Sequence, residues 1–494
     1  MEYCVLFCAG LFGAAGKDGL MMNRTESGSY REILSIALPL VVSTSSYTVM
    51  HFTDRMFLSW YSNDALAAAL PAGVTSFALL CLFLGPTSYI STFVAQYFGA
   101  QEYRRIGAIV WQGIYFALIA GVILMGVIPF SLHIFRLINH PGSLPILEAS
   151  YFKILCYGFI FTLLSSVLSG FFIGLGRTRI VMIVNMFSAG LNIILDYAWI
   201  FGKFGFPRWG IQGAAWATVL SIVIGALIFI FLYLLGENRM IYGTLAQYRL
   251  NKKLFLRVLR YGLPNGVQFF LDIAAYAIFV LLVGRLGKVE LAATNIAFNI
   301  NTIAFMPMLG FGTAATILVG QYLGKNKPEI AAQSVHRVFI ITIAYMSLIS
   351  FSYIFFPGIY VALYGSKENA ALLLDIRRMS KILLLFVAFY SFFDSFNVIF
   401  CSAIRGAGDT RFIMWVSVLS SIFVVIIPSY ITCVIYMGNV FLAWSFFTFY
   451  VIFVGVVFLG RYRSGKWKEM RVIEVPPAPL PMAPGDIAES EILL

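Results

Sequence analysis

The chain has 494 residues, of which 60% are hydrophobic and only 11% are charged. About a quarter of the residues of a soluble domain are charged, so this composition excludes a soluble enzyme or binding module and indicates a protein with many membrane spans. The formal net charge of +12 does not indicate nucleic-acid binding, because Lys and Arg are spread over short segments between apolar runs.

Twelve apolar runs are long enough to cross a bilayer, which requires about 20 helical residues. We therefore expect an all-α protein with twelve transmembrane helices. The runs lie near residues 33–59, 66–98, 107–133, 147–174, 180–201, 211–235, 254–284, 291–323, 333–357, 380–404, 412–436 and 440–460. Prolines such as Pro39 interrupt some of them and predict bends there.

The basic residues predict the orientation of the chain. Most of them follow the even-numbered runs, with the densest group at 249–260, and this asymmetry places both termini in the cytoplasm. We expect a multi-pass protein of the inner (plasma) membrane. Residues 1–29 are interpreted as a dispensable leader and cytoplasmic N-terminus, because a cleaved signal peptide contradicts the loop charges. The Pro-rich residues 463–494 are interpreted as a disordered cytoplasmic tail.

The chain contains an internal repeat. Its matching pairs are Leu38-Pro39 with Leu263-Pro264, Val94-x-Gln96-Tyr97-x-Gly99 with Val319-x-Gln321-Tyr322-x-Gly324, and Gly174-x-Gly176-x-Thr178-Arg179 with Gly406-x-Gly408-x-Thr410-Arg411. Each half therefore holds six spans in parallel orientation. We expect an amino-terminal lobe at 30–236, a basic inter-lobe loop at 237–253 and a carboxy-terminal lobe at 254–462. The lobes are related by pseudo-two-fold symmetry and enclose a central cavity.

One span carries a polar pair. Asp196 lies in the run 180–201 and follows Asn192 by four residues, so the two side chains share one helix face. An ionisable residue in a span costs roughly 3 kcal/mol on insertion scales, so it usually marks an ion or substrate path. The amide of Asn192 and the hydroxyl of Thr218 provide further oxygen atoms suited to a hard cation.

Three more aspartates, Asp54, Asp272 and Asp394, lie well inside spans. Asp54 is in the first half and the other two are in the second, at positions that the repeat does not match. Each can bind a proton or Na⁺, or can instead be a structural hydrogen bonder between helices.

The chain lacks the patterns of an enzyme. Its six cysteines show no metal-ligand spacing, and its four histidines form no motif. A membrane-embedded transferase would need a clustered catalytic set. We therefore expect a protein that is not an enzyme, has no cofactor and binds no metal beyond Na⁺ as a coupling ion.

From residue 30 to 462 the chain resembles the multidrug and toxic compound extrusion (MATE) family of the MOP flippase superfamily. The motifs that carry the resemblance are Leu38-Pro39 with Thr53-Asp54, Leu191-Asn192-Ile193-Ile194-Leu195-Asp196, Gly210-Ile211-x-Gly213-Ala214-Ala215-Trp216-Ala217-Thr218, Val94-Ala95-Gln96-Tyr97-Phe98-Gly99-Ala100 and Ile404-Arg405-Gly406-Ala407-Gly408-Asp409-Thr410. Members are cation-coupled antiporters with twelve spans in two lobes.

The resemblance implies roles for individual residues. Asp54, Asn192, Asp196 and Thr218 would form the amino-lobe site for the proton or cation, and the first helix would bend at Pro39. Asp272 and Asp394 fall where the NorM branch binds a cation in the other lobe. There are two departures from the family pattern: Asp272 replaces a longer glutamate, and Arg55 stands where a small residue is usual.

We therefore expect an H⁺- or Na⁺-coupled antiporter that exports amphipathic or cationic drugs by alternating access. It would act as a monomer in the lipid bilayer and would not bind nucleic acid. The alternative is a lipid-linked oligosaccharide flippase of the same superfamily. That alternative is less favoured because such flippases line their cavity with basic residues, whereas these spans carry mostly acids.

Overall fold

The computed structural model describes residues 27–138, 144–362 and 370–474. All regular elements in these ranges are helices, and 12 spans are long and apolar enough to cross a membrane. This confirms the predicted all-α fold with twelve spans. Helices suit this environment because their backbone groups are satisfied internally, away from water.

The spans follow one another in chain order. They are α2 (Tyr30–Tyr61), α3 (Asn63–Ser88) with α4 (Ile90–Gly99), α5 (Tyr103–Met125) with η2 (Ile128–Phe130) and α6 (Ser131–Ile138), α7 (Leu144–Gly174), α8 (Thr178–Phe201), α9 (Ile211–Tyr233), α11 (Lys252–Val283), α12 (Lys288–Gly324), α13 (Pro328–Phe355), α15 (Ala370–Ala407), α16 (Thr410–Ser420) continued by the π-helical η3 (Ser421–Ile426), α17 (Ile427–Tyr430) and the π-helical η4 (Ile431–Ile435), and α18 (Val440–Arg463). Three short helices, α10 (Gly236–Tyr242), α14 (Pro357–Ala362) and η5 (Lys466–Glu469), lie between or after them.

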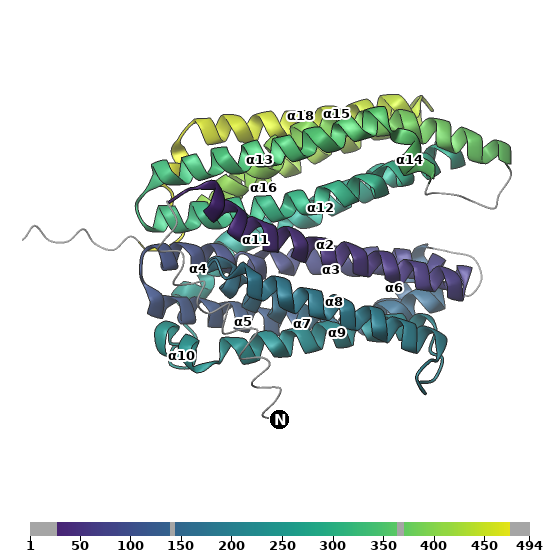
Figure 1. Cartoon of the computed structure of the whole chain (residues 1–494). Coiled ribbons are helices and arrows are strands. Elements are labelled where there is room, and N and C mark those ends of the chain that lie inside the picture. Colours follow the sequence, from purple (N-terminus) through teal and green to yellow (C-terminus); the bar gives the residue numbers. More distant parts are fainter. Residues whose placement is uncertain (1–26, 139–143, 363–369, 475–494) are drawn as a thin grey trace, which may run out of the picture.

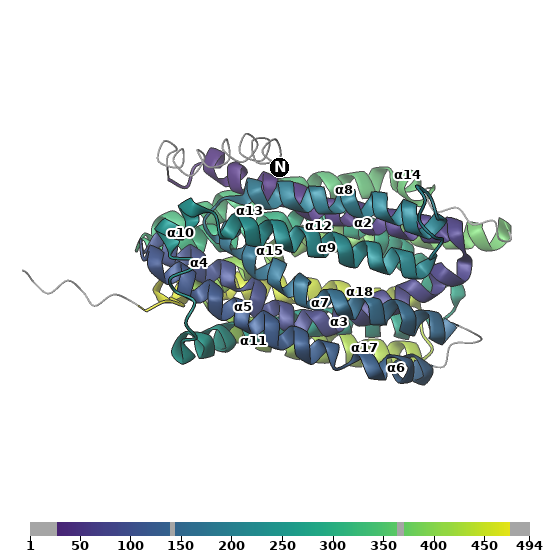
Figure 2. The same ribbon diagram turned by 90° about the horizontal axis from the view of Figure 1, so that it is seen from below.

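The spans form two halves that lie one above the other in Figure 1. The first half contains α2 to α9, and the second contains α11 to α18. Figure 2 looks onto the first half, whose long helices run roughly parallel to one another. The halves approach closely at one end of the bundle and diverge toward the other (Figure 1).

Corresponding residues of the two repeats make reciprocal contacts between the halves. The Gln96 side-chain amide on α4 donates to the Gly406 carbonyl at 2.9 Å, and the Gln321 amide on α12 donates to the Gly174 carbonyl at 2.9 Å. Gln96 corresponds to Gln321 in the repeat, and Gly174 corresponds to Gly406. The two lobes are therefore related by the expected pseudo-two-fold symmetry.

The same end of the bundle depends on glycines that let two backbones approach. A Cβ atom on Gly85 of α3 would collide with the backbone of Gly266 on α11, and one on Gly99 would collide with the carbonyl of Gln321. We call this region, where α3, α4 and α7 of the first half meet α11, α12 and α15 of the second, the closed end.

Residues 1–26 of the predicted leader and N-terminus (1–29) lie outside the described residues, and the prediction for the tail needs correction. Residues 463–474 are ordered and pack against both halves at the closed end. Trp467 is only 2% exposed and stacks on Tyr462, with ring centroids 5.1 Å apart. The backbone N–H of Val472 donates to Oε1 of Gln96 at 2.9 Å. Burial of these apolar side chains offsets the entropy of ordering the segment. Residues 475–494 lie outside the described residues.

Glu474 bridges the halves at the end of this segment. Arg257 of α11 donates to its carboxylate at 2.9 Å, and Arg105 of α5 binds the other oxygen. Burial raises the pKa of the Glu474 carboxyl, but the hydrogen bonds from the two arginines lower it more, so the pKa lies below its usual range. The bridge is therefore complete above the ordinary carboxyl range and is lost only as the pH falls through the lowered pKa.

We expect Glu474→Gln to loosen the segment at neutral pH by less than about 1 kcal/mol, because the bridge is partly exposed to solvent. Amide hydrogen exchange of residues 466–474 should be faster in this variant, and the difference from wild type should disappear in acid. Glu469→Gln, which changes an exposed carboxylate of the same segment, is the control. Equal exchange in all three proteins at neutral pH would contradict the role of the bridge.

Candidate functional site

The structure brings together the four predicted residues of the first half. Asp54 of α2 and Asp196 of α8 approach within hydrogen-bonding reach of each other and are 6% and 0% exposed. The Asn192 amide, one helical turn before Asp196, donates to the Thr218 hydroxyl of α9 at 3.5 Å. Three helices therefore position one cluster, which we call the amino-half site.

The amino-half site has spare oxygen acceptors. Among the described residues, no N–H or O–H group donates to either carboxylate oxygen of Asp196, to Oδ1 of Asp54 or to Oδ1 of Asn192. Two buried carboxylates this close repel each other strongly in a low dielectric. A shared proton or a hard cation such as Na⁺ relieves this repulsion and satisfies the oxygens. The donor set therefore fits either ion.

Three neighbours of Asp54 complete its surroundings. His51 lies one turn earlier on α2, with its Nδ1 3.9 Å from Oδ2 of Asp54. Tyr151 of α7 lies close enough to interact electrostatically with both carboxyl groups and with Arg55. Tyr151 could not be predicted from the sequence, because tyrosines are frequent in these spans and no spacing relates α7 to α2.

The second half holds the other two predicted acids, Asp272 on α11 and Asp394 on α15, close enough to interact electrostatically. Gln268 donates to Asp272 at 3.4 Å, and Asn397 donates to Asp394 at 3.0 Å. A guanidinium also reaches this cluster, since Arg405 of α15 donates to Gln268 at 3.1 Å. We call these five residues the carboxy-half site.

Gln268, Asn397 and Arg405 were not among the residues predicted from the sequence. Gln268 and Asn397 lie four and three residues from an acid on their own helices, a spacing that could have indicated them. Arg405 reaches Gln268 of α11 from α15, and the periodicity of a single sequence does not relate residues on two different helices.

Pro39 does not interrupt α2, which continues as one helix from Tyr30 to Tyr61. The missing N–H of Pro39 removes the intrahelical bond to the Ser35 carbonyl, so α2 is weakened between two of its contacts with α12 of the second half. Before Pro39, the Tyr322 hydroxyl donates to the Glu32 carboxylate at 2.7 Å, and after it the Thr44 hydroxyl donates to the Met306 carbonyl at 3.0 Å.

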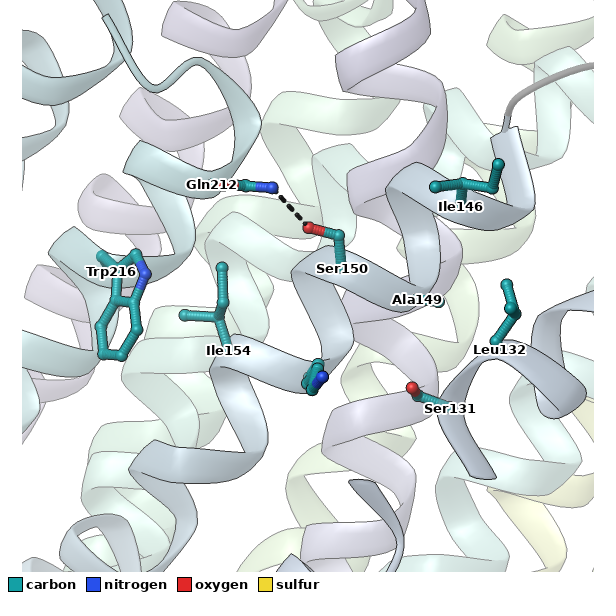
Figure 3. A pocket seen from close by; sticks show the side chains of 9 residues that line it. Ser131, Leu132, Ile146, Ala149, Ser150, Ile154, Gln212 and Trp216 are labelled. Atoms are coloured by element: carbon teal, nitrogen blue, oxygen red, sulfur yellow. Dashed lines mark hydrogen bonds between the residues drawn. The ribbon is translucent and has the colours of Figure 1, made fainter. Parts of the chain in front are cut away.

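A cavity of about 460 Å³ lies on the first half between α6, α7 and α9 (Figure 3). Its polar side chains include Gln212, which donates to Ser150 at 3.0 Å, and Lys153. None of the predicted acids lines it. In the described part of the chain, no group of three or more His, Cys, Asp or Glu residues is placed to hold a metal ion.

Twelve spans in two symmetry-related halves define the class of this protein, an integral membrane protein with the two-lobed architecture of transporters. The family model MatE matches residues 39–198 and 264–431, and the chain therefore belongs to the MatE family.

Known proteins agree with this assignment. The "Probable multidrug resistance protein NorM" of Thermotoga maritima is 26% identical over 90% of this chain and 94% of its own length. The "Multidrug resistance protein NorM" of Burkholderia vietnamiensis is 28% identical over 76% and 81%. An outward-facing multidrug resistance MATE family transporter of the MOP superfamily superposes with a TM-score of 0.82 over 92% of this chain and 99% of its own, at 20% identity, and shows the shared fold. The chain is thus a NorM-like MATE transporter.

Proposed function

We propose that this protein exports amphipathic or cationic small molecules, including drugs, in exchange for H⁺ or Na⁺. The names of its relatives support drug efflux. The observation that carries the ion coupling is the amino-half site, in which two buried carboxyl groups lie together with unpartnered oxygen atoms.

The position of the closed end supports alternating access. Arg104, Arg177 and Lys325 follow the helices that meet there, so the positive-inside rule assigns the closed end to the cytoplasm. The described conformation would then be closed to the cytoplasm, with both termini on that side and the protein in the inner membrane as a monomer. Rocking of the two halves about the central axis opens the other route.

An ion drives this change only through its differential affinity for the two states. In the described state the amino-half carboxyl groups are nearly inaccessible, so ion exchange requires the surrounding helices to move. Binding of a proton or Na⁺ favours the arrangement in which both carboxyl groups are buried and neutralised.

The test is efflux of a fluorescent organic cation from proteoliposomes that contain the purified protein. An imposed pH gradient and an imposed Na⁺ gradient are applied separately, with protein-free liposomes as the control. We expect efflux under at least one gradient, and the effective gradient identifies the coupling ion. Efflux no faster than in protein-free liposomes under both gradients would reject drug antiport.

A further inference from the structure

Arg405 makes one contact through its backbone and a different one through its side chain. Its backbone carbonyl accepts a hydrogen bond of 2.9 Å from the Tyr89 hydroxyl of the first half. The adjacent carbonyl, that of Gly406, accepts the bond from Gln96. The backbone at 405–406 is therefore part of the closed end, and a shift of α15 by even one ångström would break both bonds.

The side chain of Arg405 points to the carboxy-half site. Its Nη2 donates to Oε1 of Gln268 at 3.1 Å, and its guanidinium lies over the Phe269 ring, 5.3 Å from the centroid. The amide nitrogen of Gln268 donates to Oδ2 of Asp272 at 3.4 Å. Gln268 is only 6% exposed, so its hydrogen-bonding groups depend on these protein partners.

The amide of Gln268 is thus oriented by opposite charges on its two sides. Its NH₂ faces the carboxylate and its oxygen faces the guanidinium, which is the favourable arrangement while Asp272 is ionised. A protonated Asp272 keeps an acceptor oxygen but loses its charge and gains an O–H donor, and a bound cation adds a positive charge, so in both cases the reverse orientation of the amide becomes more favourable. In that orientation the NH₂ faces Arg405, which has donors only, and the link to α15 is lost.

We propose that Gln268 and Arg405 are positioning residues that transmit the charge state of Asp272 to the closed end. The ionised carboxylate holds Arg405 through the Gln268 amide and so favours the hydrogen bonds to Tyr89 and Gln96. Neutralisation of Asp272 releases Arg405 and favours opening. This inference rests on the proposed function, because it gives the second acidic site a role in ion-coupled opening.

The experiment is a double-mutant cycle with the opening of the closed end as its readout. Spin labels are attached at Arg104→Cys and Lys327→Cys, exposed positions on opposite halves of the closed end. Cys4 and Cys8 are replaced by serine, while the four buried cysteines are kept. Distances between the two labels are measured by pulsed electron paramagnetic resonance in the absence of any drug. Their distribution gives the ratio of open to closed molecules. Asp272→Asn is introduced into three backgrounds, which are the wild-type protein, the Gln268→Met variant and the Gln212→Met variant.

We expect Asp272→Asn to raise the open-to-closed ratio of wild type at least about fivefold, the lower range of measured couplings between sites. The change should remain in Gln212→Met, which removes an amide on α9 of the first half, whereas the carboxy-half site lies on α11 and α15 of the second. In the Gln268→Met background the effect of Asp272→Asn on the open-to-closed ratio should fall below about twofold, because the hydrogen-bonded link between Asp272 and Arg405 is absent. Arg405→Gln breaks the link from α15 and gives a second test if Gln268→Met does not fold.

Two results would overturn the inference: no effect of Asp272→Asn in wild type, or an undiminished effect in Gln268→Met and Arg405→Gln. Failure of drug antiport is a separate outcome. It appears in the efflux assay as a wild-type protein that moves no organic cation, whereas the distance measurement contains no drug.

Discussion

Asp196→Asn is expected to abolish gradient-driven export. Asparagine is nearly isosteric but binds no proton and carries no charge, so the amino-half site can no longer distinguish the ion-bound from the ion-free state. A near-complete switch between two states needs about 5.5 kcal/mol of differential binding. If the Asp54–Asp196 pair supplies even part of this, efflux under the effective gradient should fall at least about tenfold.

The control for this substitution is Asp64→Asn, which alters an exposed carboxylate in the first turn of α3. Its efflux should equal that of wild type, and both variants should elute as monodisperse protein. Undiminished gradient-driven efflux from Asp196→Asn would show that this residue is not needed for ion coupling and would assign the coupling to the carboxy-half site. Asp272→Asn and Asp394→Asn would then be measured in the same vesicles.

Gly85→Val is expected to prevent the closed end from forming. The added Cβ would occupy the space of the Gly266 backbone, and a backbone on another helix cannot rotate away as a side chain can. Overpacking costs typically 1–3 kcal/mol, so we expect the closed state to be disfavoured by about 2 kcal/mol or more. The Arg104–Lys327 label pair should report mostly open molecules, and export should be lost.

Gly73→Val is the matched control, because Gly73 lies on the same helix α3 and has open space around its Cβ position. The two substitutions carry the same cost in helix propensity. A closed-state distance distribution in Gly85→Val that equals that of Gly73→Val would show that the close approach is not required.

The sequence predicted the spans and the repeat well, for a physical reason. Apolar runs of about 20 residues have few structural solutions in a bilayer, and repeated motifs such as those of Gln96 and Gln321 impose symmetry on the fold. Asn192 and Asp196 were predicted to share a face from their spacing alone. Their meeting with Asp54 was expected only from the family resemblance, because no local pattern relates two helices so distant in the sequence.

Two features could not be predicted in the same way. The link from Asp272 through Gln268 to Arg405 crosses between helices, and its partners are single polar residues in apolar runs. The order of residues 463–474 was missed because the prolines from Pro476 onward determined the composition of the predicted tail. The apolar residues Trp467 and Val472, which are buried, indicated an ordered segment, but the proline-rich composition of the rest of the tail outweighed them in the prediction.

The reciprocal hydrogen bonds of Gln96 and Gln321 affect how readily ions leak across the membrane through the protein. The bonds lie on either side of the pseudo-two-fold axis, so a rotation of one half strains both together. Packed interfaces of this kind shift between discrete arrangements and do not deform gradually. The closed end should therefore open cooperatively, with few half-open molecules. A transporter with this property dissipates little of the ion gradient through leakage while it waits for its substrate.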